Sequence, residues 1–446
     1  MIQVDERVGV DRILENVVAV VMAGGMGARL RPLTDVRSKP AMPFAGIHRI
    51  VDFPLSSCIN SGIRRILVLT QYKSQSLSQH LKKGWSFLSR NLDQFIDEVP
   101  AQMQQGSNWY SGTANAIRQN VGLLDTLDAS EVLILSGDHV YKMDYGRMKQ
   151  FHDEKRAAVT IAVARATVKR ARRQFGVVEA REDGRVVSFK EKPQHPKRIN
   201  GGDECYASMG IYLFNYKVLK ELLRDDPRDF GRGIFSKISP DGARVFAYDF
   251  SANNAIPEWE FSASEGERTK ALVERASDSD YWRDIGTVKA YWRAHLDLVA
   301  TTPRFNLYGE RWPIFSAPLE SPPAKFVHES YERTGIAVNS LISNGVIISG
   351  AHVRSSVLGP HVYVHSYSLI ENSVLLGGLE QGSVIYDTSI GRSCRVRNAI
   401  VDKSVRLRPG TTIGYDRRED ERRGLTTYVL DGEESYLVVV PRGLSI

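Results

Sequence analysis

A group of glycines and cations near the start of the chain could bind phosphate. It follows an apolar stretch and consists of Gly24, Gly25, Gly27, Arg29 and Lys39. Glycines let the backbone turn tightly and bring bare N–H groups against an anion, while the cations spread positive charge over phosphate oxygens. The string matches neither a Walker GxxxxGK[ST] loop nor a Rossmann GxGxxG loop. A glycine turn with solvated basic residues is the alternative, but the ordered set GGxGxRL, PLT and KP favours a phosphate-binding loop.

Asp138 could bind a divalent cation. It follows the apolar stretch Val132 to Ser136, and Gly137 allows the chain to turn between them. Mg²⁺ keeps most of its waters and takes one or two protein carboxylates together with substrate phosphates. For an isolated Gly-Asp pair, a helix cap is the commoner interpretation.

A polar loop with two adjacent aromatic residues spans Glu98 to Ile117 and leads into a helix predicted near Thr113. Trp109 and Tyr110 could stack on a flat base while neighbouring amides bind its edge. On residue types alone, anchoring of the loop by these two rings is an equal alternative.

Glu191 and Lys192 end a hairpin predicted around Asp183-Gly184, over Phe175 to Lys192. A compact ammonium suits a phosphate dianion, and a carboxylate accepts hydrogen bonds from hydroxyl groups. Without further context, this EKP string indicates a solvated charged loop.

The elements that must position these residues alternate between strands and helices. Val17 to Ala23 has the length and composition of a strand buried on both faces of a parallel sheet. The other expected strands are 66–70, 132–136 and 157–164, and the expected helices are 77–88 and 145–155. The pattern predicts a layered α/β domain over residues 1–300, with ligands at the carboxyl ends of its strands.

The period changes after a proline-rich linker expected over residues 301–325. Aliphatic residues then recur at every sixth position, in the three series Val364, Ile370, Leu376; Val384, Ile390, Val396; and Val401, Leu407, Ile413. This repeat predicts a parallel β-helix over residues 326–446, with a β-sandwich as the alternative. The open ends of a β-helix must be covered, which favours an oligomer.

The composition excludes several classes of protein. With 446 residues, 42% hydrophobic and 25% charged, the chain is long enough for two globular domains. No apolar run approaches the length of a membrane span, and the acidic start lacks the apolar core of a signal peptide, so we expect a cytoplasmic protein. Cys58, Cys205 and Cys394 lack the spacing of a zinc site or a disulfide framework. The net charge of +7 is scattered among 52 acidic residues, which argues against nucleic-acid binding.

The string VVAVVMAGGMGARLRPLTDVRSKP resembles the signature of the sugar-nucleotide pyrophosphorylases, which make NDP-sugars from an NTP and a sugar 1-phosphate. The resemblance covers nearly the whole chain. It implies a Rossmann-like, mostly parallel nucleotidyltransferase domain followed by a left-handed parallel β-helix. Later motifs narrow it to bacterial members that use ATP, glucose 1-phosphate and Mg²⁺, form homotetramers and bind phosphorylated effectors.

The resemblance also implies roles for individual residues. The catalytic residues would be Arg29, Lys39, Asp138, Lys192 and Asp284, with the two aspartates as metal ligands. The substrate contacts would be Gly24, Gly25, Gly27, Gln102, Tyr110, Gly176, Glu191, Lys192 and Ser208. Arg37, Arg49 and Arg395 would bind effectors, while Gln71 and Trp109 match positions that pass a regulatory signal.

The chain departs from the family pattern in three places. Val36 and Pro43 stand where enterobacterial members carry Lys and His, so a response to fructose 1,6-bisphosphate does not follow. Arg232 and Gly233 stand where Lys-Asp is expected, and the stretch 251–278 is longer than usual. A pyrophosphorylase for another nucleotide, a bifunctional sugar acetyltransferase and a non-catalytic regulatory homologue are the alternatives.

Overall fold

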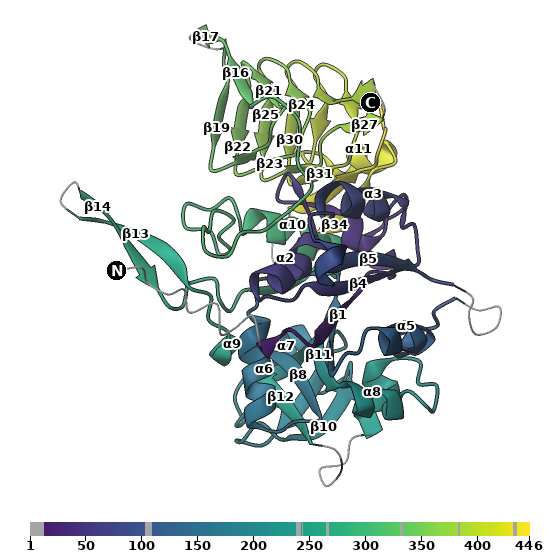
Figure 1. Cartoon of the computed structure of the whole chain (residues 1–446). Coiled ribbons are helices and arrows are strands. Elements are labelled where there is room, and N and C mark those ends of the chain that lie inside the picture. The colour runs from purple at the N-terminus through teal and green to yellow at the C-terminus, as the bar shows by residue number, and fades with distance from the viewer. Residues whose placement is uncertain are drawn as a thin grey trace. The chain divides into compact units, whose positions relative to one another are not determined.

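Figure 1 shows the computed structural model of the chain, which describes residues 13–102, 109–237, 242, 244–264, 267–330, 333–381, 384–430 and 435–446. Two units emerge from the contacts within the chain. The sheet unit comprises Met1–Gly25, Val51–Trp282 and Tyr308–Phe315. The β-helix unit comprises Met26–Ile50, Arg283–Leu307 and Ser316–Ile446. Each unit is therefore built from separate stretches of the chain.

A nine-stranded, mostly parallel sheet forms the centre of the sheet unit, as the described residues show. Its strands are β1 (Val17–Met22), β4 (Arg65–Thr70), β5 (Phe95–Pro100), β6 (Glu131–Ser136), β8 (Val159–Thr167), β9 (Gly176–Ala180), β10 (Val186–Glu191), β11 (Glu204–Asn215) and β12 (Val245–Asp249). β1 pairs in parallel with both β4 and β6, and β11 runs antiparallel to β6. Because β1 has neighbours on both edges and is buried on both faces, its apolar run is explained. The predicted α/β domain is confirmed.

Helices pack around this sheet (Figure 1). They are α2 (Asp52–Asn60), α3 (Gln75–Gly84), α4 (Thr113–Gln119), α5 (Val121–Thr126), α6 (Tyr145–Glu154), α7 (Val168–Ala171), α8 (Tyr216–Leu222) and α9 (Phe250–Asn253). Asp144 caps α6 by accepting a hydrogen bond from the Gly146 N–H. The predicted hairpin is β9–β10, where Gly184 adopts a φ of 87° that glycine tolerates best.

The long stretch noted in the sequence contains a hairpin of its own. β13 (Glu258–Ser264) and β14 (Glu267–Val273) pair in antiparallel fashion, and the hairpin projects from the rest of the sheet unit (Figure 1). The extra residues are thus accommodated outside the sheet.

Three parallel ladders form the β-helix. The first contains β16 (Lys325–Val327), β21 (Ile347–Ser349), β24 (Val362–Val364), β29 (Thr388–Ile390) and β32 (Arg406–Leu407). The second contains β19 (Ile336–Val338), β22 (His352–Arg354), β25 (Leu369–Glu371), β30 (Arg395–Arg397) and β33 (Thr412–Ile413). The third contains β20 (Leu341–Ile342), β23 (Val357–Leu358), β26 (Val374–Leu375), β31 (Ala399–Val401), β35 (Tyr436–Val440) and the antiparallel edge strand β34 (Thr426–Val429).

The six-residue period corresponds to columns of buried side chains. Val364, Ile390 and Leu407 are in register in the first ladder, and Ile370, Val396 and Ile413 in the second. All six are buried. The parallel pairing excludes the β-sandwich, and the predicted β-helix is confirmed. Of the predicted repeat positions, the side chain of Val384 lies outside the described residues.

The remaining elements of the β-helix unit come from two earlier stretches and the end of the chain. They are β2 (Pro43–Phe44), β3 (His48–Arg49), α10 (Val288–Leu296) and α11 (Arg417–Arg422). α10 is joined to the β-helix by a hydrogen bond from the Trp292 indole N–H to the carbonyl oxygen of Asn372 (2.8 Å). Both stretches therefore belong structurally with the β-helix.

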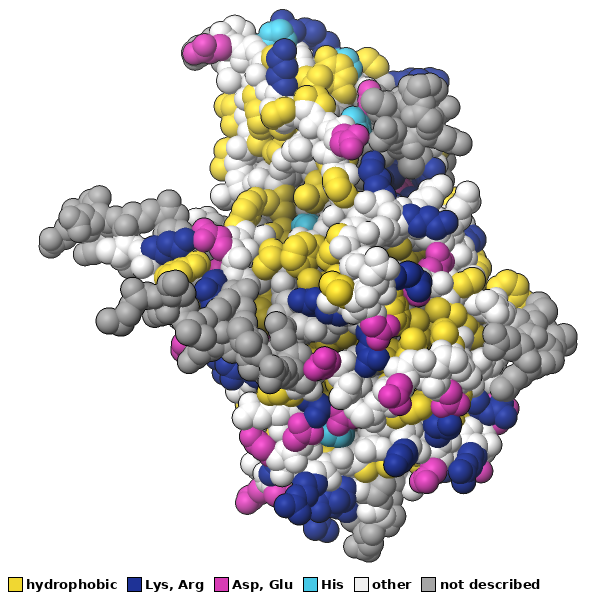
Figure 2. Space-filling model, viewed as in Figure 1, with side chains coloured by type: hydrophobic (Ala, Val, Ile, Leu, Met, Phe, Trp, Pro, Cys, Tyr) yellow, Lys and Arg dark blue, Asp and Glu magenta, His cyan; other side chains and the backbone are white. Residues whose placement is uncertain are grey.

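Surface side chains differ between regions of the molecule. Apolar side chains are exposed on the first coils of the β-helix, visible as yellow in Figure 2, and they include Phe326, Ile336, Val338 and Ile347. Elsewhere on the face shown, basic and acidic side chains are interspersed (Figure 2). In the part of the chain that is described, no helix has the length and apolar character needed to cross a membrane.

Candidate active site and effector site

Two neighbouring parallel strands deliver Gly24 and Asp138 to the same edge of the sheet. Met22 at the end of β1 is paired with Ser136 at the end of β6. A Cβ added at Gly24 would lie 3.1 Å from the Cβ of Gln71, and one at Gly137 would lie 2.9 Å from the carbonyl oxygen of Met22. A larger residue at Gly24 or Gly137 would therefore force its neighbours to shift, whereas a Cβ at Gly25 would meet no described atom within 4 Å.

Hydrogen-bond donors surround the Asp138 carboxylate. The Ser136 hydroxyl donates to Asp138 Oδ1, and His139 Nε2 lies 3.4 Å from the same oxygen. His139 begins strand β7 (His139–Tyr141), so Asp138 caps no helix, and the alternative interpretation of this residue is excluded. The Trp282 indole N–H donates to His139 Nδ1 (3.3 Å). Sequence reasoning missed Ser136, His139 and Trp282 as members of this site, although the first two lie within two positions of Asp138.

Residues 103–108 of the loop expected near a nucleotide base lie outside the described residues, whereas the residues on either side of them are described. Gln102 and Trp109 are exposed, Trp109 by 51%. The hydroxyl of Tyr110 accepts a hydrogen bond from Asn120 (2.9 Å), and burial raises the pKa of Tyr110. Gln71 donates to the carbonyl oxygen of Tyr110 (3.3 Å), which links it to the residue after Trp109.

Glu191 and Lys192 lie at the end of β10, beside a cavity of about 380 Å³. The Lys192 ammonium is 3.6 Å from Glu191 Oε1. The residues that line the cavity are Ser111, Gly112, Thr113, Glu191, Lys192, Arg228, Asp229 and Arg232. Arg228 and Arg232 were not predicted here. The cavity therefore offers three cations and two carboxylates, a suitable combination for a phosphorylated sugar.

Two glycines leave room for the Glu191 side chain. A Cβ at Gly231 would lie 2.5 Å from Glu191 Oε2, and one at Gly176 would lie 3.0 Å from the same atom. Gly231 belongs to a single π-helical turn, Phe230–Ile234, a rare element often found at functional sites. Ser208 lies on β11, buried, with its Oγ 3.3 Å from the hydroxyl of Tyr212.

Three of the predicted catalytic residues gather within the β-helix unit. Lys39 Nζ lies 3.2 Å from Asp284 Oδ1, and Lys39 is buried. A Cβ at Gly286 would lie 2.8 Å from Asp284 Oδ2 and 3.4 Å from Arg29 Nη2. Gly27 adopts a φ of 63° and accepts a hydrogen bond from Thr34 through its carbonyl oxygen. Cations and the second candidate metal ligand thus lie together.

A separate basic cluster occupies the β-helix unit. Arg37 forms a buried ion pair with Asp402 (2.8 Å), while its Nη1 atom is buried without a hydrogen-bond partner among the described residues. Burial, with the positive charges of Arg49 and Arg37, lowers the pKa of Lys403 to about 7, and Arg442 acts in the same direction. A bound anion would relieve this crowding of cations.

The basic cluster differs in part from the predicted set. Arg37 and Arg49 belong to it, and Lys403 and Arg442 were missed because neither stands in a motif. Arg395 lies on β30, where its guanidinium carbon is 4.3 Å from the centroid of the Tyr415 ring.

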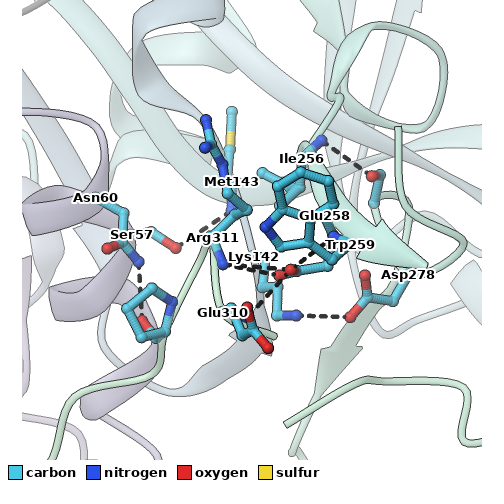
Figure 3. A network of polar contacts seen from close by, with 12 residues as sticks. Ser57, Asn60, Lys142, Met143, Ile256, Glu258, Trp259, Asp278, Glu310 and Arg311 are labelled. Atoms are coloured by element: carbon cyan, nitrogen blue, oxygen red, sulfur yellow. Dashed lines mark hydrogen bonds and ion pairs between the residues drawn. The ribbon is translucent and has the colours of Figure 1, made fainter. Parts of the chain in front are cut away.

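A network of buried polar contacts holds three stretches of the sheet unit together (Figure 3). Lys142 Nζ pairs with Asp278 Oδ2 at 2.9 Å, and the Glu258 carboxylate accepts hydrogen bonds from the backbone N–H groups of Glu310 and Arg311 (Figure 3). The Asn60 amide donates to the carbonyl oxygen of Pro313 (2.9 Å). The Tyr308–Phe315 segment is thereby fixed to the sheet unit.

Comparison with protein families defines the class. Residues 18–301 match the model described as nucleotidyl transferase, and residues 322–429 match one described as GlmU-like, C-terminal hexapeptide. The chain is thus a nucleotidyltransferase joined to a hexapeptide-repeat domain. Nucleotidyltransferases of this kind typically use a divalent metal ion.

Individual relatives are more specific. The glucose-1-phosphate adenylyltransferase from Nitrosospira multiformis is 44% identical to the chain, over 93% of this chain and 93% of its own. The one from Deinococcus radiodurans is also 44% identical, over 96% of this chain and 98% of its own. The one from Nitrosococcus oceani is 41% identical over 98% of this chain and 96% of its own. The chain therefore belongs to the glucose-1-phosphate adenylyltransferase family.

Proposed function

We propose that the chain transfers an adenylyl group from ATP to α-D-glucose 1-phosphate, giving ADP-glucose and diphosphate for the synthesis of glycogen or a related α-glucan. The observation that carries the proposal is the 41–44% identity to enzymes of that name along almost the whole chain. It is supported by the side chains described above, which offer cations and carboxylates where phosphates and sugar hydroxyls would lie.

The reaction needs no nucleophile from the protein, because the attacking phosphate oxygen of glucose 1-phosphate is already anionic. The protein aligns the two substrates and stabilises the developing charge. In our proposal Arg29 and the Gly24–Gly27 amides bind the triphosphate with help from Lys39. Gln102 and Tyr110 lie near the adenine. Lys192 binds the phosphate of the sugar, and Glu191 binds sugar hydroxyls alongside Gly176 and Ser208.

We further propose Mg²⁺ as the metal ion, with Asp138 and Asp284 as its protein ligands. Two carboxylates fit the oxygen donors that Mg²⁺ prefers, and the bound ion would neutralise phosphate charge during the transfer. The covalent chain supports the pairing: Asp138 adjoins His139, whose side chain contacts Trp282, and Asp284 follows Trp282 by two residues. Two residues of chain span about 7 Å at most, so both carboxylates are attached close to this contact.

For regulation, we propose that phosphorylated metabolites bind the cluster of Arg37, Arg49, Lys403 and Arg442. The unpartnered Arg37 Nη1 and the lowered pKa of Lys403 support an anion there. Arg395 stays a candidate, and Gln71 and Trp109 stay candidates for transmitting the signal. The chain would act as a homotetramer, in which other subunits cover the apolar first coils of the β-helix.

The experiment is a screen of ATP, UTP, dTTP and GTP against several sugar 1-phosphates with Mg²⁺, measuring diphosphate release. Turnover should be highest with ATP and glucose 1-phosphate. Preference for another nucleotide would support a different pyrophosphorylase, and a folded chain inert with every pair would support the non-catalytic homologue. Adding a panel of phosphorylated metabolites to the best pair tests the regulation.

A further inference from the structure

Two segments of the sheet unit that are far apart in sequence are joined side by side. One contains His139 and Lys142, directly after Asp138; the other contains Asp278 and Trp282, shortly before Asp284. Trp282 Nε1 donates to His139 Nδ1 at 3.3 Å, with the two rings nearly perpendicular and 5.5 Å apart. Lys142 Nζ pairs with Asp278 Oδ2 at 2.9 Å (Figure 3). The two contacts fix both the separation and the direction of the segments.

The ion pair between them is deeply buried. Lys142 and Asp278 are 1% and 2% exposed. Asn254, also buried, adds a third connection, because its amide donates to the carbonyl oxygens of Lys142 (2.9 Å) and Ser279 (2.6 Å). A buried ion pair adds little stability relative to well-packed apolar side chains, since desolvation offsets the attraction. The Lys142–Asp278 pair is therefore better explained as a contact that positions the two segments than as one that stabilises the fold.

The Trp282 contact also orients His139 toward Asp138. An indole N–H can only donate, so His139 Nδ1 accepts, and the ring proton resides on Nε2. That atom lies 3.4 Å from Asp138 Oδ1. Groups that bond to metal ligands in this way set the orientation of those ligands, and their loss typically weakens metal binding by about 10- to 100-fold.

We propose that Trp282, His139 and the Lys142–Asp278 pair are positioning residues for the divalent cation. They hold the segment that carries Asp138 beside the segment that leads to Asp284, so that two carboxylates are presented to one ion. The inference rests on the proposed function, in which these aspartates bind the metal. Mg²⁺ demands near-ideal octahedral geometry, so small displacements of either segment should weaken its binding.

The test is Trp282→Phe in the full chain, which keeps an aromatic ring and removes the indole N–H. Mn²⁺ binding is measured by electron paramagnetic resonance of the free ion with ATP present, against a reference that contains the same ATP without protein. We expect affinity for Mn²⁺ to fall about 10-fold, the Mg²⁺ concentration for half-maximal rate to rise similarly, and the KM for glucose 1-phosphate to stay unchanged.

Trp292→Phe is the matched control. It removes the indole N–H bond to Asn372 in the β-helix unit and should leave Mn²⁺ binding as in the wild type. The double variant Lys142→Met/Asp278→Leu replaces the ion pair by apolar side chains and should fold but bind Mn²⁺ more weakly. If it does not fold, Trp282→Phe still decides.

Asp138→Asn distinguishes failure of the proposed metal site from failure of the proposed positioning residues. If this variant loses bound Mn²⁺ while Trp282→Phe binds it normally, the positioning proposal is wrong and the metal site stands. If Asp138→Asn binds Mn²⁺ as well as the wild type, or the wild type binds none, the proposed metal site fails and the positioning proposal fails with it.

Discussion

The charged groups of the two units have opposite kinds of surroundings. In the sheet unit, the carboxylate of Asp138 is contacted by a hydroxyl and a histidine ring. In the β-helix unit, the positive charges of Arg49, Arg37 and Arg442 act on Lys403, and Asp402 is the carboxylate that pairs with Arg37. In our proposal the first arrangement binds a cation and the second binds an anion.

This difference shows how the charges around a site determine the kind of ligand that the site is suited to bind. Where a hydroxyl group and a histidine ring hold one carboxylate in place, the site is suited to a metal ion. Where cations are crowded and one has a lowered pKa, the site is suited to phosphate groups. The following changes test or sharpen the contrast.

Breaking the Arg37–Asp402 pair should have the largest effect, on the β-helix unit. Asp402→Leu leaves Arg37 buried without its partner, near the cations Arg49, Lys403 and Arg442, and should lower the free energy of unfolding by about 3–5 kcal/mol. Urea unfolding measures the change. The double variant Arg37→Met/Asp402→Leu should recover part of the loss, because it also removes one of the crowded cations. A single variant as stable as the wild type would contradict the importance of the pair.

Removing one charge from the candidate metal site should affect catalysis instead. Asp138→Asn keeps the shape and the contact with Ser136 but should reduce kcat by about 10²–10³. Diphosphate release measures the rate, and circular dichroism shows whether the variant is folded. Asp153→Asn, at an exposed position on α6, is the control. Near-normal diphosphate release by a folded Asp138→Asn would refute the assignment.

Lys192→Gln should weaken binding of the sugar phosphate. A hydrogen bond to a charged group contributes about 1.5–3 kcal/mol, so the KM for glucose 1-phosphate should rise about 10- to 150-fold, with little change for ATP. Lys190→Gln on the same strand is the matched control, since Lys190 does not line the 380 Å³ cavity. Equal effects of the two substitutions would exclude a specific role for Lys192.

The smallest effect concerns pH and the basic cluster. With a pKa of about 7, Lys403 is charged at pH 6 and largely neutral at pH 8, so its contribution to binding inorganic phosphate, used as the probe anion, should decrease up to about 10-fold over this range. Isothermal titration calorimetry in two buffers should also show proton uptake on binding near pH 7.5.

In the Lys403→Met variant, the affinity for the anion should change with pH only through titration of the ligand's own phosphate groups. The effect of Lys403 on the free energy of unfolding runs the other way. Above pH 7 the unfolded chain holds a proton that the folded chain has released, so this lysine makes the free energy of unfolding rise from about pH 7 to 10.5. Phosphate binding with the same pH dependence in the wild type and in Lys403→Met would show that Lys403 does not contact the anion.

Local patterns predicted most of the fold. The strand Val17–Met22, the hairpin around Gly184 and the six-residue columns of the β-helix follow from burial that repeats along short stretches. The immediate surroundings of Asp138 could have been inferred, because Ser136 and His139 are its near neighbours in sequence. The assignment of roles to Asp284, Lys192 and Glu191 depended on family resemblance.

Contacts between distant positions could not be predicted. Arg37 and Asp402 are separated by 365 positions, and Lys142 and Asp278 by 136. Nothing in local composition distinguishes Lys403 or Arg442 from the other cations among the 59 lysines and arginines. Such pairs are determined by how strands and coils stack, which a single sequence does not reveal.

The interleaving of the two units limits how this protein can be cut or recombined. Arg29, Lys39 and Asp284 belong to the unit that contains the β-helix, although they precede it in the chain. A fragment ending near residue 315 would keep these side chains but lose the coils that complete their unit. Gene fusions that exchange the C-terminal third should therefore impair the transferase. Exchanging the proposed effector site between homologues would require grafting Met26–Ile50 as well.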